Sequence, residues 1–195
     1  MLWNDTTNGC ASGTTINQLN RFKKLLIHYF CPDLYARSVS QINLRQLKSK
    51  GYTTLFIDLD NTLLGWRGKE ISKEVEAWIR EAKELGYKIQ IVSNTFRRRV
   101  NSFAAHLGID GISTALKPRK QVFLNGLKAV GSKPNEAVVI GDQMFTDVFG
   151  GKRLGLFTIL VEPVSERELF TTHLMRIPER ILLNRFRKLG LLVSA

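Results

Sequence analysis

The chain contains 195 residues, 44% of them hydrophobic, which is enough for one domain with a sizeable core. Its 29 lysines and arginines outnumber 17 aspartates and glutamates, so the formal net charge is +12. This balance argues against acidic proteins or neutral metabolites as partners and favours polyanions, either nucleic acid or an anionic membrane. The two cysteines, Cys10 and Cys31, lack a C-x-x-C spacing, so we expect free thiols rather than a disulfide or a zinc site.

The N-terminal stretch lacks the basic and apolar regions of a secretory signal peptide. Residues 1–18 are polar and contain glycine, serine and threonine, so we expect a flexible extension there and a single domain over 19–195. Residues 19–30 mix apolar and basic side chains, which predicts an amphipathic helix. A second segment of this kind, 178–193, lies near the C-terminus.

The apolar run 55–59 predicts a short buried strand of a parallel sheet, and two carboxylates stand at its end. Asp58 and Asp60 should point the same way, because side chains two residues apart share a face of a strand. Carboxylates so close repel each other unless a cation or a shared proton compensates, and this repulsion pushes their pKa values apart. One carboxylate can then act as a nucleophile while the other transfers protons. A strand that merely ends in a capped turn is the alternative.

The segment after this acidic pair leaves no room for an inserted domain. It offers only a flap around residues 65–68 and one amphipathic helix over 72–85, which Ser72 would cap. The next connection holds one basic helix, 96–107, and a short strand, 111–113. The site would therefore stay open, which suits a large substrate or requires a lid from a neighbouring subunit.

Two further segments bring phosphate-binding groups to the ends of extended runs. The expected strand Lys88–Val92 is followed by Ser93 and Asn94, whose hydroxyl and backbone N–H groups suit phosphate oxygens. Lys117 precedes Pro118 in an extended segment, and Pro118 suits the first turn of a helix. An ordinary surface lysine is the alternative for Lys117.

A last apolar run, 137–140, predicts another strand, and it ends in Gly141 and Asp142, with Asp147 close behind. Two more carboxylates at a strand end would cost stability through mutual repulsion unless they bind a cation. The pattern therefore indicates a metal site at this edge of the expected sheet.

Taken together, these motifs resemble those of the haloacid dehalogenase superfamily of phosphatases. They are Asp58-Leu59-Asp60-Asn61-Thr62, Ser93-Asn94, Lys117-Pro118, and Gly141-Asp142 through Asp147. The resemblance implies an α/β fold, a Rossmann-like three-layer α/β/α core with a mostly parallel sheet and no cap domain, and a site at the carboxyl ends of the strands. The second acid, Asp60, argues against halide chemistry.

The resemblance also implies a catalytic and a metal-binding set. Asp58 would be the nucleophile, and Asp60 would be the general acid and then the general base. Mg²⁺ would be held by the side chains of Asp58 and Asp142 and by the main-chain carbonyl of Asp60.

The remaining motif residues would serve the phosphoryl group and its surroundings. Ser93, the Asn94 main chain and Lys117 would bind the transferring phosphoryl group. Asp147 would orient Lys117 or a metal-bound water, and Thr62 would support the acidic pair.

The two amphipathic ends allow two interpretations. They would either pack on the core with their basic side chains in water or lie on an anionic membrane surface. Their apolar runs are far shorter than the roughly 20 residues that a spanning helix needs. The basic run 97–99 would either attract anionic head groups or form a solvated helix face. We expect no nucleic-acid partner, because the sequence has no reading helix, zinc pattern or aromatic and glycine recognition motif.

From residue 31 onward the chain resembles the YqeG-type phosphatases, relatives of the phosphatidylglycerophosphate phosphatases. Its most discriminating element is Asp142-Gln143 with Thr146-Asp147. This resemblance implies removal of the terminal phosphate from phosphatidylglycerophosphate, giving phosphatidylglycerol. The enzyme would be cytoplasmic and peripheral at the inner membrane face, or on the matrix side of an organelle in a eukaryote.

The sequence is also compatible with two other functions. One is a capless phosphatase acting on nucleic-acid ends or on a soluble sugar phosphate, the latter with an oligomeric neighbour closing the site. The other is a non-catalytic protein that binds a partner through the same fold.

Overall fold

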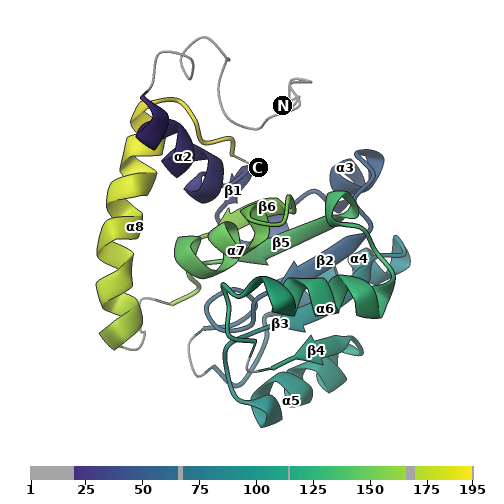
Figure 1. Cartoon of the computed structure of the whole chain (residues 1–195). Coiled ribbons are helices and arrows are strands. Elements are labelled where there is room, and N and C mark those ends of the chain that lie inside the picture. Colours follow the sequence, from purple (N-terminus) through teal and green to yellow (C-terminus); the bar gives the residue numbers. More distant parts are fainter. Residues whose placement is uncertain (1–19, 66–67, 114, 166–169, 195) are drawn as a thin grey trace.

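A six-stranded sheet forms the centre of the molecule in the computed structural model (Figure 1). The structure describes residues 20–65, 68–113, 115–165 and 170–194, so the expected extension 1–18 and part of the expected flap at 65–68 lie outside it. The strands follow the order β1-β6-β5-β2-β3-β4, and all neighbouring pairs are parallel. Their bounds are β1 Leu34–Ala36, β2 Thr54–Ile57, β3 Lys88–Val92, β4 Asp110–Ile112, β5 Ala137–Gly141 and β6 Phe157–Val161.

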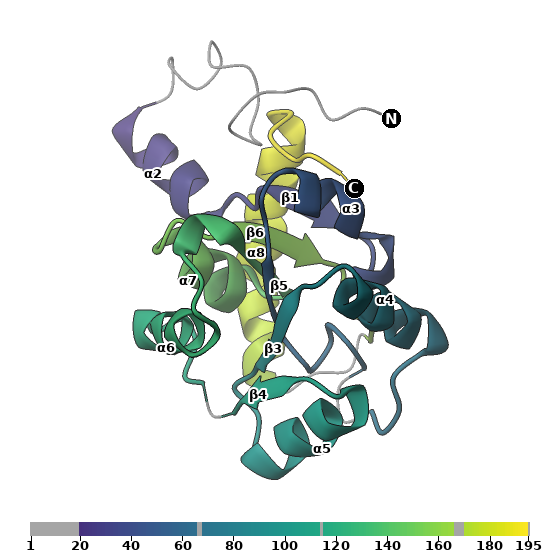
Figure 2. The same cartoon turned by 90° about the vertical axis from the view of Figure 1, so that its right-hand side faces the viewer.

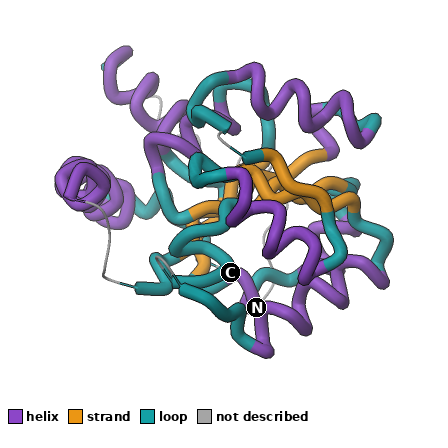
Figure 3. The backbone as a smooth tube through the Cα atoms, turned by 90° about the horizontal axis from the view of Figure 1, so that it is seen from below, coloured by secondary structure: helices purple, strands orange, loops and turns teal. Residues whose placement is uncertain are grey.

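Helices cover both faces of this sheet, which gives the expected three-layer α/β/α arrangement (Figures 2 and 3). The cluster of buried side chains on one face includes α3, α4 and α5, whereas the cluster on the other includes α6. The helix bounds are α2 Arg21–Phe30, α3 Leu44–Ser49, α4 Lys73–Glu84, α5 Arg97–Leu107, α6 Lys120–Val130, α7 Phe149–Lys152 and α8 Phe170–Lys188. Three shorter helical segments are η1 Val39–Gln41, η2 Pro134–Glu136 and the π-helical turn η3 Met144–Val148.

The central strand β2 is buried along its whole length, as a parallel strand covered on both faces should be. Leu55 and Ile57 belong to the cluster under α4, whereas Phe56 packs on the other face against Phe123 of α6. Each such burial contributes about 1.5–3 kcal/mol. Gly126 of α6 lets the helix approach, because a Cβ there would lie 2.9 Å from the Phe56 ring.

Helix α4 follows the sequence expectation closely. The Ser72 hydroxyl accepts a hydrogen bond from the Val75 backbone N–H at 3.3 Å, which satisfies one of the first-turn donors. Glu74 and Glu76 lie in the first turn, where the helix dipole favours negative charge. The connection from β2 to β3 therefore contains this one helix among its described residues, and no inserted domain.

Two expected boundaries are wrong. Strand β2 ends at Ile57 rather than at residue 59, because Asn61 turns the chain with a left-handed φ of +61° and its N–H bonds to the Leu64 carbonyl at 2.7 Å. Pro118 does not lie in the first turn of a helix. Helix α6 begins later, at Lys120, with Arg119 as its N-cap residue.

The C-terminal helix α8 starts earlier than the sequence suggests and continues through Pro178. Phe186 of α8 and Ile27 of α2 are buried in one cluster with Met144 and Val148 of η3. The two amphipathic helices are thus packed on the domain through their apolar sides. Within the described residues, no helix has the length and apolar character that a membrane-crossing segment requires.

Candidate active site

The order of the strands brings three of the predicted motifs to one place. Strand β2 lies between β3 and β5, so Asp58, Ser93 and Asp142 follow three adjacent strand ends. The chain proceeds outward from β2 through β3 and β4 and then returns to the other side of β2 with β5. Open α/β sheets bind ligands at such a switch point, outside the carboxyl ends of the strands.

Lys117 is the centre of the polar cluster at this switch point. Its ammonium group donates to Asp58 Oδ1 and to Asp147 Oδ1, both at 2.6 Å. Its backbone is held as well: the Lys117 N–H donates to Asn94 Oδ1 at 2.8 Å, and Asn94 Nδ2 donates to the Lys117 carbonyl at 3.3 Å. The Asn94 side chain therefore positions Lys117, a role that the sequence did not suggest.

Ser93 lies at the same point but makes different contacts. Its side chain is buried, and its hydroxyl accepts from the Thr95 N–H at 3.4 Å. The Ser93 carbonyl accepts from the Ala115 N–H at 3.0 Å, which ties the end of β3 to the segment that carries Lys117. The structure thus brings Ser93, Asn94 and Lys117 together, and their binding of a phosphoryl group stays a prediction.

A close approach between β5 and η3 fixes Asp147. A Cβ at Gly141 would lie 2.2 Å from the Asp147 carboxylate, so a larger residue at this strand end would displace it. The second Asp147 oxygen accepts from the Gln143 N–H at 3.2 Å. The π-helical form of η3 is typical of functional sites, and here it turns Asp147 back toward Lys117.

The buried carboxylates carry more negative charge than Lys117 alone can balance. The pKa of Asp142 is raised to about 8, mainly by burial, which outweighs the lowering influence of Arg176, and the Asp58 and Asp147 charges act in the same direction as burial. Burial also raises the pKa of Asp147, against the influence of Lys117. For Lys117, burial alone would lower the pKa, but the Asp147 and Asp58 carboxylates outweigh it and raise the pKa.

A divalent cation fits this excess of negative charge. Asp58, Asp142 and Asp147 each offer an oxygen, and these atoms all lie within 4.8 Å of one another in buried positions. Clustered carboxylate oxygens are the donors that a hard cation such as Mg²⁺ prefers. Two of these residues are in the expected ligand set. The third, Asp147, is not in that set, and the Asp60 main-chain carbonyl stays a predicted ligand.

Adding Mg²⁺ to the metal-free protein should raise its Tm, because a ligand that binds only the native state stabilises it by about 2.7 kcal/mol at 100 times Kd. We expect Asp142→Asn to lose most of this shift, since one carboxylate of the cluster is removed. Differential scanning calorimetry with and without Mg²⁺ measures it. Asp110→Asn, which changes an exposed carboxylate on β4, is the control. Equal Mg²⁺-induced shifts in the two variants would place the metal elsewhere.

Asp60 and Thr62 lie around this buried cluster rather than in it. The Asp60 side chain is 23% exposed and accepts two hydrogen bonds from the Arg99 guanidinium, at 2.8 and 3.0 Å. Arg99 belongs to the basic run 97–99, so one member of that run holds the predicted acid–base residue in place. The Thr62 hydroxyl donates to Asp142 Oδ1 at 3.3 Å, which supports the predicted metal ligand.

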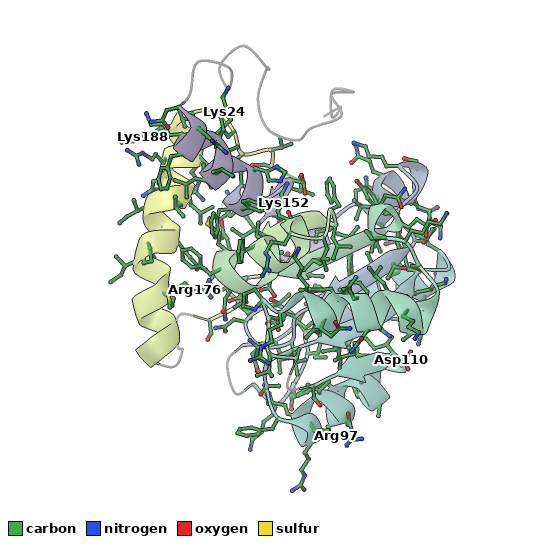
Figure 4. The ribbon with its side chains drawn as sticks, viewed as in Figure 1. Lys24, Arg97, Asp110, Lys152, Arg176 and Lys188 are labelled. Atoms are coloured by element: carbon green, nitrogen blue, oxygen red, sulfur yellow. The ribbon has the colours of Figure 1, made fainter. Side chains whose placement is uncertain are left out.

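Two residues of α8 complete the site and carried no sequence signal. Arg176 lies on the side of α8 that faces the rest of the domain (Figure 4). Its buried guanidinium donates to the carboxylate and to the main-chain carbonyl of Asp142. It also pairs at 3.1 Å with Glu179, which accepts from the Phe145 N–H at 3.2 Å. Asp142 and Arg176 are 34 residues apart, so no local spacing relates them.

The comparison with protein families decides the identity of this arrangement. The model of the haloacid dehalogenase-like hydrolases matches residues 36–155, which includes β2 to β5 and all the predicted site residues. The chain is a haloacid dehalogenase-like hydrolase. The hydrolase is also 38% identical over 166 residues to the "Probable phosphatase YqeG" of Bacillus subtilis (strain 168), covering 85% of this chain and 96% of that protein. It therefore belongs to the YqeG-type phosphatases of the superfamily.

Two more relatives of this hydrolase differ in the share of their length that is matched. One is the "Phosphatidylglycerophosphate phosphatase 1, chloroplastic/mitochondrial" of Arabidopsis thaliana, 27% identical over 84% of this chain but only 50% of that protein. The other is the "Glyceraldehyde 3-phosphate phosphatase" of Pyrococcus furiosus, 31% identical over 38% of this chain and 31% of that protein. The names of these relatives thus agree on phosphate-ester hydrolysis and differ in substrate.

Proposed function

We propose that this hydrolase cleaves phosphomonoesters through a phosphoaspartyl intermediate on Asp58. The observation that carries the proposal is the buried group in which Lys117 bridges Asp58 and Asp147 beside Asp142. Phosphoryl transfer asks a protein mainly for in-line positioning and charge neutralisation. A fixed carboxylate next to a fixed lysine and a cation site supplies both.

The reaction proceeds in two displacements at phosphorus. An Asp58 oxygen forms a bond to phosphorus while the bond to the ester oxygen breaks, and Asp60 gives its proton to the departing alcohol. Asp60, now ionised, takes a proton from water, whose oxygen attacks the same phosphorus. Inorganic phosphate leaves and the Asp58 carboxylate is restored.

The other residues of the site serve charge and position during these steps. Lys117 faces the equatorial oxygens of the phosphoryl group, and the Ser93 hydroxyl with the Asn94 backbone N–H binds them from the β3 side. Asp58, Asp142 and the Asp60 carbonyl would hold Mg²⁺. When bound, this ion would offset the developing negative charge on the phosphoryl oxygens.

We infer further that the substrate is phosphatidylglycerophosphate and the product phosphatidylglycerol. The Arabidopsis relative supports this by its printed name, although the chain spans only half of that protein's length. The described connections between β2 and β4 hold one helix each and no enclosing domain, which suits a substrate anchored in a lipid surface. The net charge of +12 suits an anionic surface as well.

The amphipathic helices offer the surface for such contact. On α8, Ile177 and Ile181 are exposed and lie one turn apart, among exposed basic side chains. On α2, Phe22 and Leu25 are exposed in the same way. A basic helix with an exposed apolar row is the pattern of a peripheral membrane contact. The proposed location is therefore the inner face of a membrane.

Phosphate release from phosphatidylglycerophosphate in mixed micelles, measured with Mg²⁺ and with EDTA, tests the substrate. We expect Mg²⁺-dependent turnover and a kcat/KM at least tenfold above that for glyceraldehyde 3-phosphate, since the two share only the monoester. Micelles without the substrate phospholipid are the control. Faster hydrolysis of the soluble ester would show that the substrate is a sugar phosphate and not the lipid, in line with the partial match to the Pyrococcus protein. An oligomer that closes the site would then be the next property to measure.

A further inference from the structure

A pocket beside the catalytic cluster has no part in the steps derived so far. Its volume is about 630 Å³, within the range of small-ligand sites, and it lies between α8 and the carboxyl end of β6. Asp142 forms part of its wall, so the pocket is continuous with the predicted metal ligand. Asp142 follows β5, the neighbour of β2, so a group attached to a phosphate at Asp58 would extend toward this pocket.

One face of α8 forms the far wall of this pocket. Arg176, Arg180, Leu183 and Arg187 follow each other at helical spacing and all line it. The wall is fixed at one end by the buried Arg176, which bonds to Asp142 and Glu179, and at the other by Phe186 in the apolar cluster. The pocket is thus built by a packed helix rather than by loops.

Most charged groups of the pocket are already engaged by neighbours. Arg187 donates to the Tyr35 hydroxyl at 3.1 Å, and the Tyr35 hydroxyl donates to Glu162 at 3.1 Å. Glu179 and Asp142 are held by Arg176. Arg180 differs, because its exposed side chain has no ion pair with any residue that the structure describes. It is the cation available to a ligand.

We propose that this pocket binds the second, non-scissile anionic group of the substrate, a phosphodiester, with Arg180 as its cationic partner. The inference rests on the proposed function, because it requires that the monoester to be cleaved is bound at Asp58. A guanidinium matches the two free oxygens of a phosphodiester bidentately. Leu160 and Pro163 on the sheet side give apolar surface to the glycerol carbons between the phosphates. In place of an inserted domain, α8 would thus select the substrate.

Soluble compounds separate this pocket from both the membrane and the catalytic cluster. The deacylated head group, glycerophosphoglycerophosphate, contains the monoester and the diester, whereas glycerol 3-phosphate contains the monoester alone. We expect the ratio of their kcat/KM values to fall about tenfold in Arg180→Gln, mainly through KM, because one charge-assisted contact is lost. Arg185→Gln is the matched control, since Arg185 is exposed on α8 and does not line the pocket. An unchanged ratio in Arg180→Gln would overturn the proposal.

A second measurement does not depend on turnover of the head group. Glycerophosphoglycerol has the diester and no monoester, so it should inhibit hydrolysis of glycerol 3-phosphate, with an inhibition constant about tenfold higher in Arg180→Gln. Absence of inhibition in the wild type would exclude a diester site, whatever the fate of the lipid substrate. Inhibition that Arg180→Gln weakens, together with no cleavage of phosphatidylglycerophosphate, would support the pocket and reject the proposed substrate.

Discussion

Replacing Asp58 by asparagine is expected to lower kcat by about 10⁴-fold or more, because the amide cannot form the covalent bond to phosphorus. The protein should stay folded, since the change replaces one of three crowded buried carboxylates by a neutral group of the same shape. Phosphate release under single-turnover conditions measures the loss. Calorimetry of the same sample establishes that the fold is intact.

Trapping of the intermediate distinguishes this role of Asp58 from a purely electrostatic one. After acid quench of a reaction with radiolabelled substrate, the wild type should carry phosphate that hydroxylamine releases, as an acyl phosphate does. Asp58→Asn should carry none. Asp60→Asn should retain the label longer, because the base for the hydrolytic step is missing. Label on Asp58→Asn would show that another residue is the nucleophile.

Replacing Lys117 by alanine is expected to destabilise the protein by about 3–5 kcal/mol in addition to removing activity. The lysine is the ion-pair partner of both Asp58 and Asp147, and its loss leaves two buried carboxylates without compensation. Urea unfolding at neutral pH measures the change in the free energy of unfolding. The matched control is Lys120→Ala, an exposed lysine three residues on, which should cost less than about 0.5 kcal/mol.

Acidic pH should return part of the stability that Lys117→Ala loses. The pKa of Asp147 is already raised in the wild type by burial, and removing the lysine takes away the influence that lowers it. A carboxyl with a raised native pKa favours folding at low pH and opposes it as the pH rises. The unfolding free energies of Lys117→Ala and wild type should therefore converge as the pH falls. A constant gap would show that the loss is one of packing.

The positions of Asp58, Ser93 and Asp142 at strand ends were predictable because each of these residues follows an apolar run. The burial of β2, β3 and β5 reflects these runs, and parallel pairing places their carboxyl ends together. The bond between Lys117 and Asp147 agrees with the orienting role that the resemblance implied for Asp147, whereas the bond between Lys117 and Asp58 was not anticipated. The turn at Asn61 was not predictable, since a left-handed residue shortens β2 without changing the apolar pattern that predicts it.

The contribution of α8 could not be predicted from sequence. Arg176 looks like any basic residue of an amphipathic helix, and its contact with Asp142 depends on the packing of α8 against η3 through Phe186 and Glu179. The contact of the Asn94 side chain is a similar case, because its partner is the backbone of Lys117. Every residue has a backbone N–H or carbonyl group, so the sequence does not indicate which one a side chain will bind. Long-range packing decides these contacts.

The pairing of residues after α8 with strand β1 has a consequence for biosynthesis. The Tyr35 N–H donates to the Val193 carbonyl at 2.7 Å, so this segment covers the edge of the sheet, and Arg176, in the first half of α8, pairs with Asp142. On the ribosome, all six strands emerge before either element does. A nascent chain therefore holds an uncovered strand edge until residue 193 emerges, and it lacks the Arg176 partner of Asp142 until α8 emerges; an uncovered edge is the feature through which chains aggregate.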